Sequence, residues 1–149
     1  MSIKIKKCPT ADSKEELLIA IAMHKSDVQK GCAFIANKII EAGIKHDYSK
    51  IPTIDEYMAE HKSGITISEG KWHKKHITEE RHHLKERCPD DVNLIDVIEL
   101  LTDCTMAAIA RRGNLRTTET TDFISIDILE KAFKNTVEML KTEIILEND

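Results

Sequence analysis

The fold is decided by residues 13–43, SKEELLIAIAMHKSDVQKGCAFIANKIIEAG. Ser13 and Glu16 stand three residues apart, the spacing of a capping box at a helix N-terminus. Side chains of one stripe then recur every three or four residues, at Leu17, Ile21, His24, Val28, Cys32, Ile35 and Ile39. This period predicts one long helix whose stripe faces the core, with a bend at Gly31 and an end at Gly43.

The segments that follow are also typical of helices. A short helix is expected over 53–61 and a polar one over 71–87. Another is expected to begin at Asp90, Asp91 or Asn93 and to run until Gly113, and a last one is expected from Ser125 to Ile144. No segment alternates with a period of two, and 65–67 is the only candidate strand. We therefore expect an all-α, compact bundle of about five helices, with residues 1–149 as a single domain and an irregular N-terminus over 1–12.

Composition and charge argue against several classes of protein. The 149 residues carry 22 Lys and Arg against 26 Asp and Glu, a net charge of -4, which argues against a dedicated nucleic-acid binder. The four cysteines contain no C-x-x-C pair, so we expect reduced thiols. The longest apolar run, Leu17–Met23, is too short for a bilayer and no signal peptide is recognisable, so we expect a cytoplasmic protein without membrane association.

Histidines and carboxylates fall at positions that suit a metal site. His24 lies on the stripe of the first helix, where it is either a ligand or a core histidine bonded to a backbone carbonyl. His46 and Asp47 are adjacent at the end of that helix, and divalent metals accept imidazole and carboxylate ligands together. Lys50 follows, placed to hold a phosphate as a point charge. A helix-capping Asp47 and a solvated Lys50 are the structural alternative.

The polar segment 71–87 adds more candidate ligands. Steps of three, four and three put one set of residues on a single helix face, namely His73, His76, Glu80 and His83. His76 and His83 are the better candidates to bind one ion. His73 and His82 fall at the rim of that face or outside it, where histidines are usually solvated.

The helix that begins near Asn93 carries an acidic stripe among apolar residues. Asp96, Glu99 and Asp103 follow one another at steps of three and four. Asp103 lies in the most apolar part of this helix, where an unpaired carboxylate is costly. Either a metal ion or a buried arginine would satisfy it.

The ordered series of His24, His46-Asp47, helical histidines and Asp103 resembles the HD-domain superfamily of metal-dependent phosphohydrolases. His46-Asp47-Tyr48-Ser49-Lys50 looks like the H-D-x-G-K form of its signature, with Ser49 where glycine is more usual. Arg81-His82-His83 and the run DVIELLTDC over 96–104 are also similar to an uncharacterised family of short phage and bacterial proteins.

The resemblance implies an HD-like helical fold built around a divalent metal. Its primary ligands would be His24, His46, Asp47 and Asp103. His76 and His83, with His73 as an alternate, would hold a second ion. The candidate ions are Mn, Fe, Zn, Mg, Ni and Co, with one or two bound, and the expected setting is a bacterial or phage-infected cell.

Such a site predicts hydrolysis of a phosphate ester by a metal-activated water. The expected substrate is a nucleotide or another small phosphorylated metabolite, because a compact acidic domain offers a pocket rather than a cationic groove. Lys50 would neutralise charge on the phosphoryl oxygens, and a second phosphate would be bound by Arg81, Arg111, Arg112 or Arg116. Glu80 or Glu99 would act as general acid or base, or would orient a histidine.

Other interpretations use the same residues. A di-iron oxygenase would keep the ligands and react with dioxygen. A non-catalytic binding module, such as a phage-encoded binder of a nucleotide or host factor, would use the metal for stability. A helical bundle with solvated histidines would hold no metal. The apolar residues 144–146 also suggest a homodimer, since they suit a partner helix as well as the core.

Overall fold

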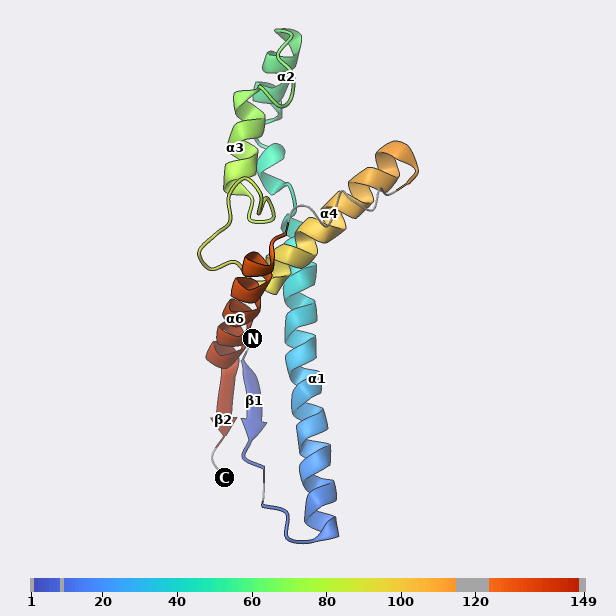
Figure 1. Cartoon of the computed structure of the whole chain (residues 1–149), viewed down its shortest axis with the longest axis vertical. Coiled ribbons are helices and arrows are strands. Elements are labelled where there is room, and N and C mark those ends of the chain that lie inside the picture. Colours follow the sequence, from blue (N-terminus) through green and yellow to red (C-terminus); the bar gives the residue numbers. More distant parts are fainter. Residues whose placement is uncertain (1, 9, 115–123, 148–149) are drawn as a thin grey trace.

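Five α-helices make up most of the described chain, residues 2–8, 10–114 and 124–147 of a computed structural model (Figure 1). The elements are β1 (Ile3–Lys6), α1 (Lys14–Lys45), the 3-10 helix η1 (Tyr48–Lys50), α2 (Ile54–Lys62), α3 (Lys71–Glu79), α4 (Leu94–Arg112), α6 (Ile126–Glu143) and β2 (Ile144–Glu147). The predicted class, a mainly α-helical fold of about five helices, is therefore confirmed. In this part of the chain, no helix combines the length and apolar character needed to cross a membrane.

Local sequence signals set most of the helix ends. The capping box of Ser13 and Glu16 is present at the start of α1, and Asn93 forms a second one with Asp96 at the start of α4. Gly113 ends α4 in the left-handed conformation (φ 72°), which glycine adopts without steric cost. Ser125 caps α6 through its side chain, as expected from the sequence.

The two termini pair with each other, which corrects two expectations. β1 and β2 form a parallel two-stranded sheet in which Ile3 lies opposite Ile144, so the N-terminus is not irregular throughout and the last helix ends before Ile144. The candidate strand over 65–67 is a loop instead. Pairing between strands about 140 residues apart leaves no periodic signal in either short segment, and that is why the sequence did not reveal it.

The helix expected over 71–87 is also shorter than predicted. α3 ends at Glu79, and Glu80 adopts an extended conformation that starts an irregular segment leading to α4. The Arg81 guanidinium holds this segment by two hydrogen bonds to the buried carboxylate of Asp96 (2.8 and 2.9 Å). It also donates to Asp91 (3.0 Å). These charge-assisted contacts outweigh the weak preference of a polar segment to stay helical.

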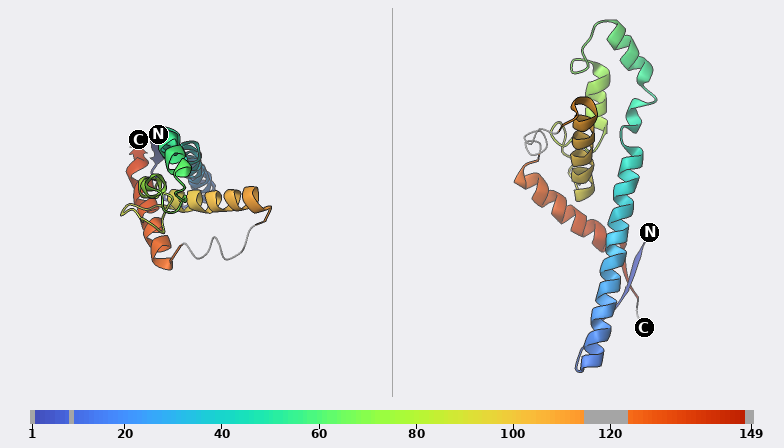
Figure 2. Two further views of the ribbon diagram at one scale, coloured as in Figure 1. Left: turned by 90° about the horizontal axis from the view of Figure 1, so that it is seen from above. Right: turned by 90° about the vertical axis from the view of Figure 1, so that its right-hand side faces the viewer.

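The small core lies where the segment after α3 meets α4 and α6. Its buried members are Leu84, Val92, Val97, Leu100 and Ala132. From this junction the elements project in different directions: α1 extends away with only the β1–β2 sheet beside its N-terminal half, while α2 and α3 form the opposite end (Figures 1 and 2). The junction is also where the C-terminal end of α1, η1, α3 and α4 come together.

Replacing Leu84 by alanine tests whether the segment after α3 belongs to the core. We expect Leu84→Ala to lower the free energy of unfolding by about 2–5 kcal/mol, because the side chain is fully enclosed and would leave a cavity. Leu101→Ala, at a half-exposed leucine of α4, is the matched control and should cost about 1 kcal/mol or less. Urea unfolding followed by circular dichroism measures both, and equal losses would contradict this packing.

Candidate metal centre

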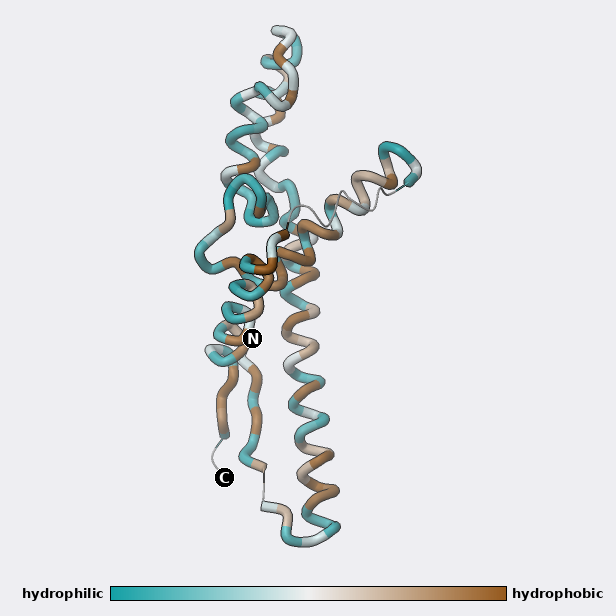
Figure 3. Tube along the Cα trace, in the orientation of Figure 1, coloured by the Kyte–Doolittle hydropathy of each residue, from teal (hydrophilic) through white to brown (hydrophobic). Residues whose placement is uncertain are grey.

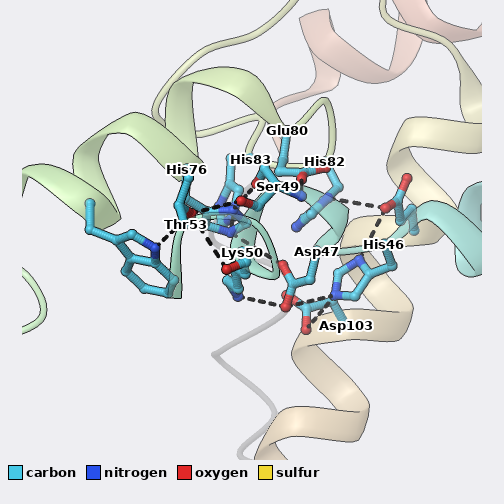
Figure 4. A network of polar contacts seen from close by, with 12 residues as sticks. His46, Asp47, Ser49, Lys50, Thr53, His76, Glu80, His82, His83 and Asp103 are labelled. Atoms are coloured by element: carbon cyan, nitrogen blue, oxygen red, sulfur yellow. Dashed lines mark hydrogen bonds and ion pairs between the residues drawn. The ribbon is translucent and has the colours of Figure 1, made fainter. Parts of the chain in front are cut away.

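His46 and Asp47 are positioned by a sharp change of backbone direction at the end of α1. The helix ends at Lys45, and Asp47 takes a left-handed conformation (φ 59°, ψ 15°), which aspartate tolerates better than most residues. As a result, two neighbouring side chains point to one place, with His46 Nε2 3.6 Å from Asp47 Oδ2 (Figure 4). A continued helix would have turned them about 100° apart.

Imidazoles from two further segments meet this pair. His76, in the last turn of α3, lies with Nε2 3.2 Å from Asp47 Oδ1. His83 follows in the segment after α3, and its Nε2 is 2.9 Å from His76 Nε2. The two histidines are thus neighbours, as the sequence suggested, but through a turn of the chain rather than along one helical face (Figure 4).

α4 completes the cluster from the opposite side. Asp103 Oδ1 lies 3.4 Å from His46 Nε2. His82 is buried between the two halves, only 1% exposed, and can share an ion either with His76 and His83 or with His46 and Glu99. The cluster therefore consists of His46, Asp47, His76, His82, His83 and Asp103.

Most separations within this cluster match those of metal ligands. Three of the distances given above between neighbouring nitrogen and oxygen atoms run from 2.9 to 3.4 Å, and that between His46 and Asp47 is slightly longer, 3.6 Å. Metal–ligand bonds of 2.0–2.1 Å at tetrahedral or octahedral angles put adjacent ligand atoms about 2.9–3.4 Å apart. The donor set of imidazole and carboxylate suits Mn, Fe, Ni, Co or Zn.

Outer partners orient the imidazoles. His46 Nδ1 lies 3.0 Å from Glu99 Oε1, and His76 Nδ1 lies 2.9 Å from Ser49 Oγ. Each ring therefore keeps Nε2 directed at the cluster while Nδ1 is held elsewhere, the arrangement usual for ligating histidines. Glu99 Oε1 also lies 3.1 Å from His82 Nδ1, within range of ionic attraction.

Buried atoms without hydrogen bonds gather in the same place. Among the described residues, those that have no partner are Asp47 Oδ1 and both ring nitrogens of His82. The contact of His82 Nδ1 with Glu99 is close enough for ionic attraction but poorly aligned for a hydrogen bond. Unsatisfied buried groups cost about 1–3 kcal/mol each. A bound cation would remove that cost, so these residues fit a metal.

The electrostatics favour the forms of these groups that bind metals. Burial, with help from Lys50, lowers the pKa of His76 to about 4, and burial together with His82 lowers the pKa of His83. For Asp47, burial opposes ionisation, but the ion pair with Lys50 lowers its pKa on balance. For His82, burial opposes protonation, but the contact with Glu99 raises its pKa on balance. Neutral imidazoles at His76 and His83 and an ionised carboxylate at Asp47 are therefore favoured at neutral pH, as ligation requires, whereas His82 would lose its proton on binding an ion.

Several predicted site residues lie elsewhere. His24 is exposed on α1, about 33 Å from His46 along the helix axis, so the structure does not bring it to the cluster. Arg81 is occupied by Asp96 and Asp91. Glu80 accepts a hydrogen bond from the backbone N–H of Ser49 (3.0 Å) and so supports η1. Arg116 lies outside the described residues.

His82 is a residue that the helical pattern put at the rim of the ligand face or outside it, and the structure buries it in the cluster. If residues 71–87 formed one helix, His82 would lie beside the face that carries His76 and His83. In an irregular segment, the side chains of neighbouring residues such as His82 and His83 can point to the same place. The signal in the sequence was that His82 and His83 are adjacent and follow an arginine. It indicates two ligands only when the segment is known to be irregular, and the hydrogen bonds of Arg81 are what keep it from being helical.

Two cavities adjoin the cluster and share Asp103. One, of about 400 Å³, is polar and is lined by Asp47, Lys50, His73, His76, His83, Asp103, Arg111 and Arg112 among others. The other, of about 340 Å³, lies between α1 and α4 and is lined mainly by apolar residues, including Ile39, Ala42, Ile95, Ile98 and Met106, with His46, Glu99 and Asp103 at one side. Cationic and apolar subsites thus flank one cluster.

Comparison with models of known protein families, with curated proteins and with solved structures found no match to this chain. The chemistry of the site is therefore argued from its own residues. Those residues form a candidate metal centre with a cationic cavity beside it.

Metal binding should depend on His82 and not on His24. We expect wild-type protein prepared without chelator, then supplied with Mn, Fe, Co or Zn, to retain one or two equivalents by mass spectrometry. His82→Gln should weaken that binding at least tenfold, because it removes a ligand at the centre of the cluster. His24→Gln is the matched control and should bind metal like the wild type.

Trp72 gives a second readout of the same prediction. It is the one tryptophan of the chain, and its ring stacks on His76 with centroids 6.2 Å apart. Paramagnetic ions such as Mn or Co should therefore quench its fluorescence in the wild type and in His24→Gln, and much less in His82→Gln. Equal loss of metal in both variants, or unchanged binding by His82→Gln, would contradict the cluster as described.

Proposed function

We propose that this protein is a metal-dependent phosphohydrolase that acts on a nucleotide or another small phosphorylated metabolite. The observation that carries the proposal is the polar cavity, whose lining combines the candidate ligands Asp47, His76 and Asp103 with the cationic side chains of Lys50, Arg111 and Arg112. A substrate phosphate would meet the metal and the cations together. Few other ligands need both at once.

The cations of this cavity come from two elements. Lys50 belongs to η1 and already pairs with Asp47, so it lies directly beside the cluster. Arg111 and Arg112 end α4, about two turns beyond Asp103. They would hold the non-reacting oxygens of the phosphoryl group, or a second phosphate, and orient the ester bond toward the metal centre.

When bound, the divalent ion would supply a Lewis acid and a water of lowered pKa near neutral pH. The role of the chain is to hold and orient. Glu99 keeps His46 turned to the ion, and Ser49 does the same for His76. Glu80 supports the backbone of η1, so we assign Glu80 and Glu99 positioning roles.

The apolar cavity supports a substrate with an organic group. It lies on the other side of Asp103 from the cations, and a volume of about 340 Å³ suits a small ligand. Ile98 and Met106 would contact a base, ring or short chain by apolar packing. A phosphate ester would then span the centre, with its charge on Arg111 and its organic part between α1 and α4.

Removing one cation should reduce turnover without removing the metal. We expect Arg111→Gln and Lys50→Gln to lower kcat/KM at least tenfold, about 1.4 kcal/mol of transition-state stabilisation each, because the phosphoryl charge loses a partner. Lys74→Gln, an exposed lysine of α3 outside the cavity, is the matched control. Phosphate release from a panel of nucleoside mono-, di- and triphosphates and simple phosphate esters measures the effect.

Metal content measured on the same samples separates the possible results. Metal-loaded wild type that releases no phosphate from any member of the panel would contradict the proposal. Tight retention of a nucleotide without turnover would favour a binding module, and metal-dependent uptake of dioxygen would favour an oxygenase. If variants of Arg111 and Lys50 hydrolyse the substrate as fast as the wild type, the cations of this cavity do not take part in the reaction.

A further inference from the structure

One face of the N-terminal half of α1 is apolar and lies in solvent. This α1 stripe consists of Leu17, Ile21, Val28 and Cys32, with His24 at its centre. Leu17 is 51% exposed and Ile21 55%. The stripe is the one whose period predicted a core-facing helix, yet its side chains are exposed among the described residues. Figure 3 shows hydrophobic segments recurring along this half of α1.

The face of α1 that does pack is a different one. Ala20, Met23 and Asp27 are half-buried on the side of the β1–β2 sheet, and the first fully buried residue of the helix is Phe34. At about 100° per residue, the α1 stripe lies roughly a quarter turn away from that side. An isolated helix with a wide apolar face is not stable in water without a partner for that face.

The total exposed area of the chain also indicates that surface is left uncovered. It measures 10782 Å², whereas a folded monomer of 16.9 kDa exposes about 7,700 Å². The excess of about 3,100 Å² per chain exceeds what each subunit buries in most obligate homodimers, about 1,000–2,500 Å². A single copy of this chain thus exposes more surface than a compact monomer of its mass, and the α1 stripe is part of that surface. Burial of the stripe in a dimer of ordinary size would remove only part of the excess.

We propose that a second copy of this chain covers the α1 stripe in a symmetric homodimer. A two-fold interface brings the same patch of both copies together, so the patch must be self-complementary. The stripe meets that condition because it carries no Asp, Glu, Lys or Arg, and its one polar member, His24, is neither acidic nor fixed in charge. Apolar side chains from two helices then bury one another.

The β1–β2 sheet next to α1 extends the uncovered surface. Two strands alone are marginally stable in water, and Ile145 and Leu146 of β2 are about half exposed. Burial against a second copy would stabilise the sheet as well as the helix. This inference is independent of the metal centre, which lies at the other end of α1, so a dimer is expected with or without metal.

Sedimentation velocity on the full chain, with and without metal, tests the proposal. We expect wild-type protein at micromolar concentration to have about twice the mass of one 16.9 kDa chain. Ile21→Glu puts a charge in the α1 stripe and should give monomers. Ile19→Glu changes another half-exposed isoleucine of α1, about 160° away around the helix, and should leave the dimer intact.

Cross-linking of the wild type keeps the test decisive if Ile21→Glu does not fold. Isotope-labelled and unlabelled chains are mixed and cross-linked, and only links between unlike copies are counted. We expect such links at Lys14 and Lys25, which flank the α1 stripe. A monomeric wild type, equal dissociation by Ile19→Glu, or intermolecular links that avoid α1 would each overturn the proposal.

Discussion

The ion pair between Arg81 and Asp96 is the interaction on which the arrangement of the site depends. Asp96 is buried, accepts two hydrogen bonds from the guanidinium, and also accepts from the backbone N–H of Asn93 at the start of α4. The hydrogen bonds that Arg81 donates to Asp96 and Asp91 raise the pKa of its guanidinium further, so the charge is permanent. One carboxylate thus caps a helix and anchors the segment that carries His82 and His83.

Folding concentrates groups at this site that do not favour one another without a cation. Two carboxylates and four imidazoles meet within a few ångströms, and some of their buried atoms have no hydrogen bond. Such an arrangement is unfavourable in a metal-free core and favourable around a divalent ion. A bound metal would therefore be coupled to the final packing of the segment after α3, as in other proteins whose sites form only on folding.

The elongated outline follows from the same organisation. The core at the junction of α4 and α6 is small, and it holds the metal centre in place without enclosing the N-terminal half of α1. The chain places its polar cluster at one end of α1 and the exposed apolar α1 stripe at the other. The proposed phosphohydrolase chemistry and the proposed association between copies thus concern separate ends of one helix.

Local signals determined much of the structure from the sequence. The capping box at Ser13 and the glycine at Gly113 act within a single turn, so the sequence alone was enough to place those helix ends. The sequence also predicted a set of candidate ligands, namely the adjacent His46 and Asp47 together with His76, His83 and Asp103. The structure brings all five side chains together.

Contacts between distant residues decided the rest. Whether His82 or His24 joins the cluster depends on where α3 ends and on α1 remaining straight past Gly31, and neither follows from periodicity. The pairing of β1 with β2 and the ion pair of Arg81 with Asp96 each join two distant segments. The local sequence of one segment does not indicate which other segment it contacts. The sequence by itself determined the helices and the donor atoms; tertiary structure decided which donors meet, because only folding sets distances between segments.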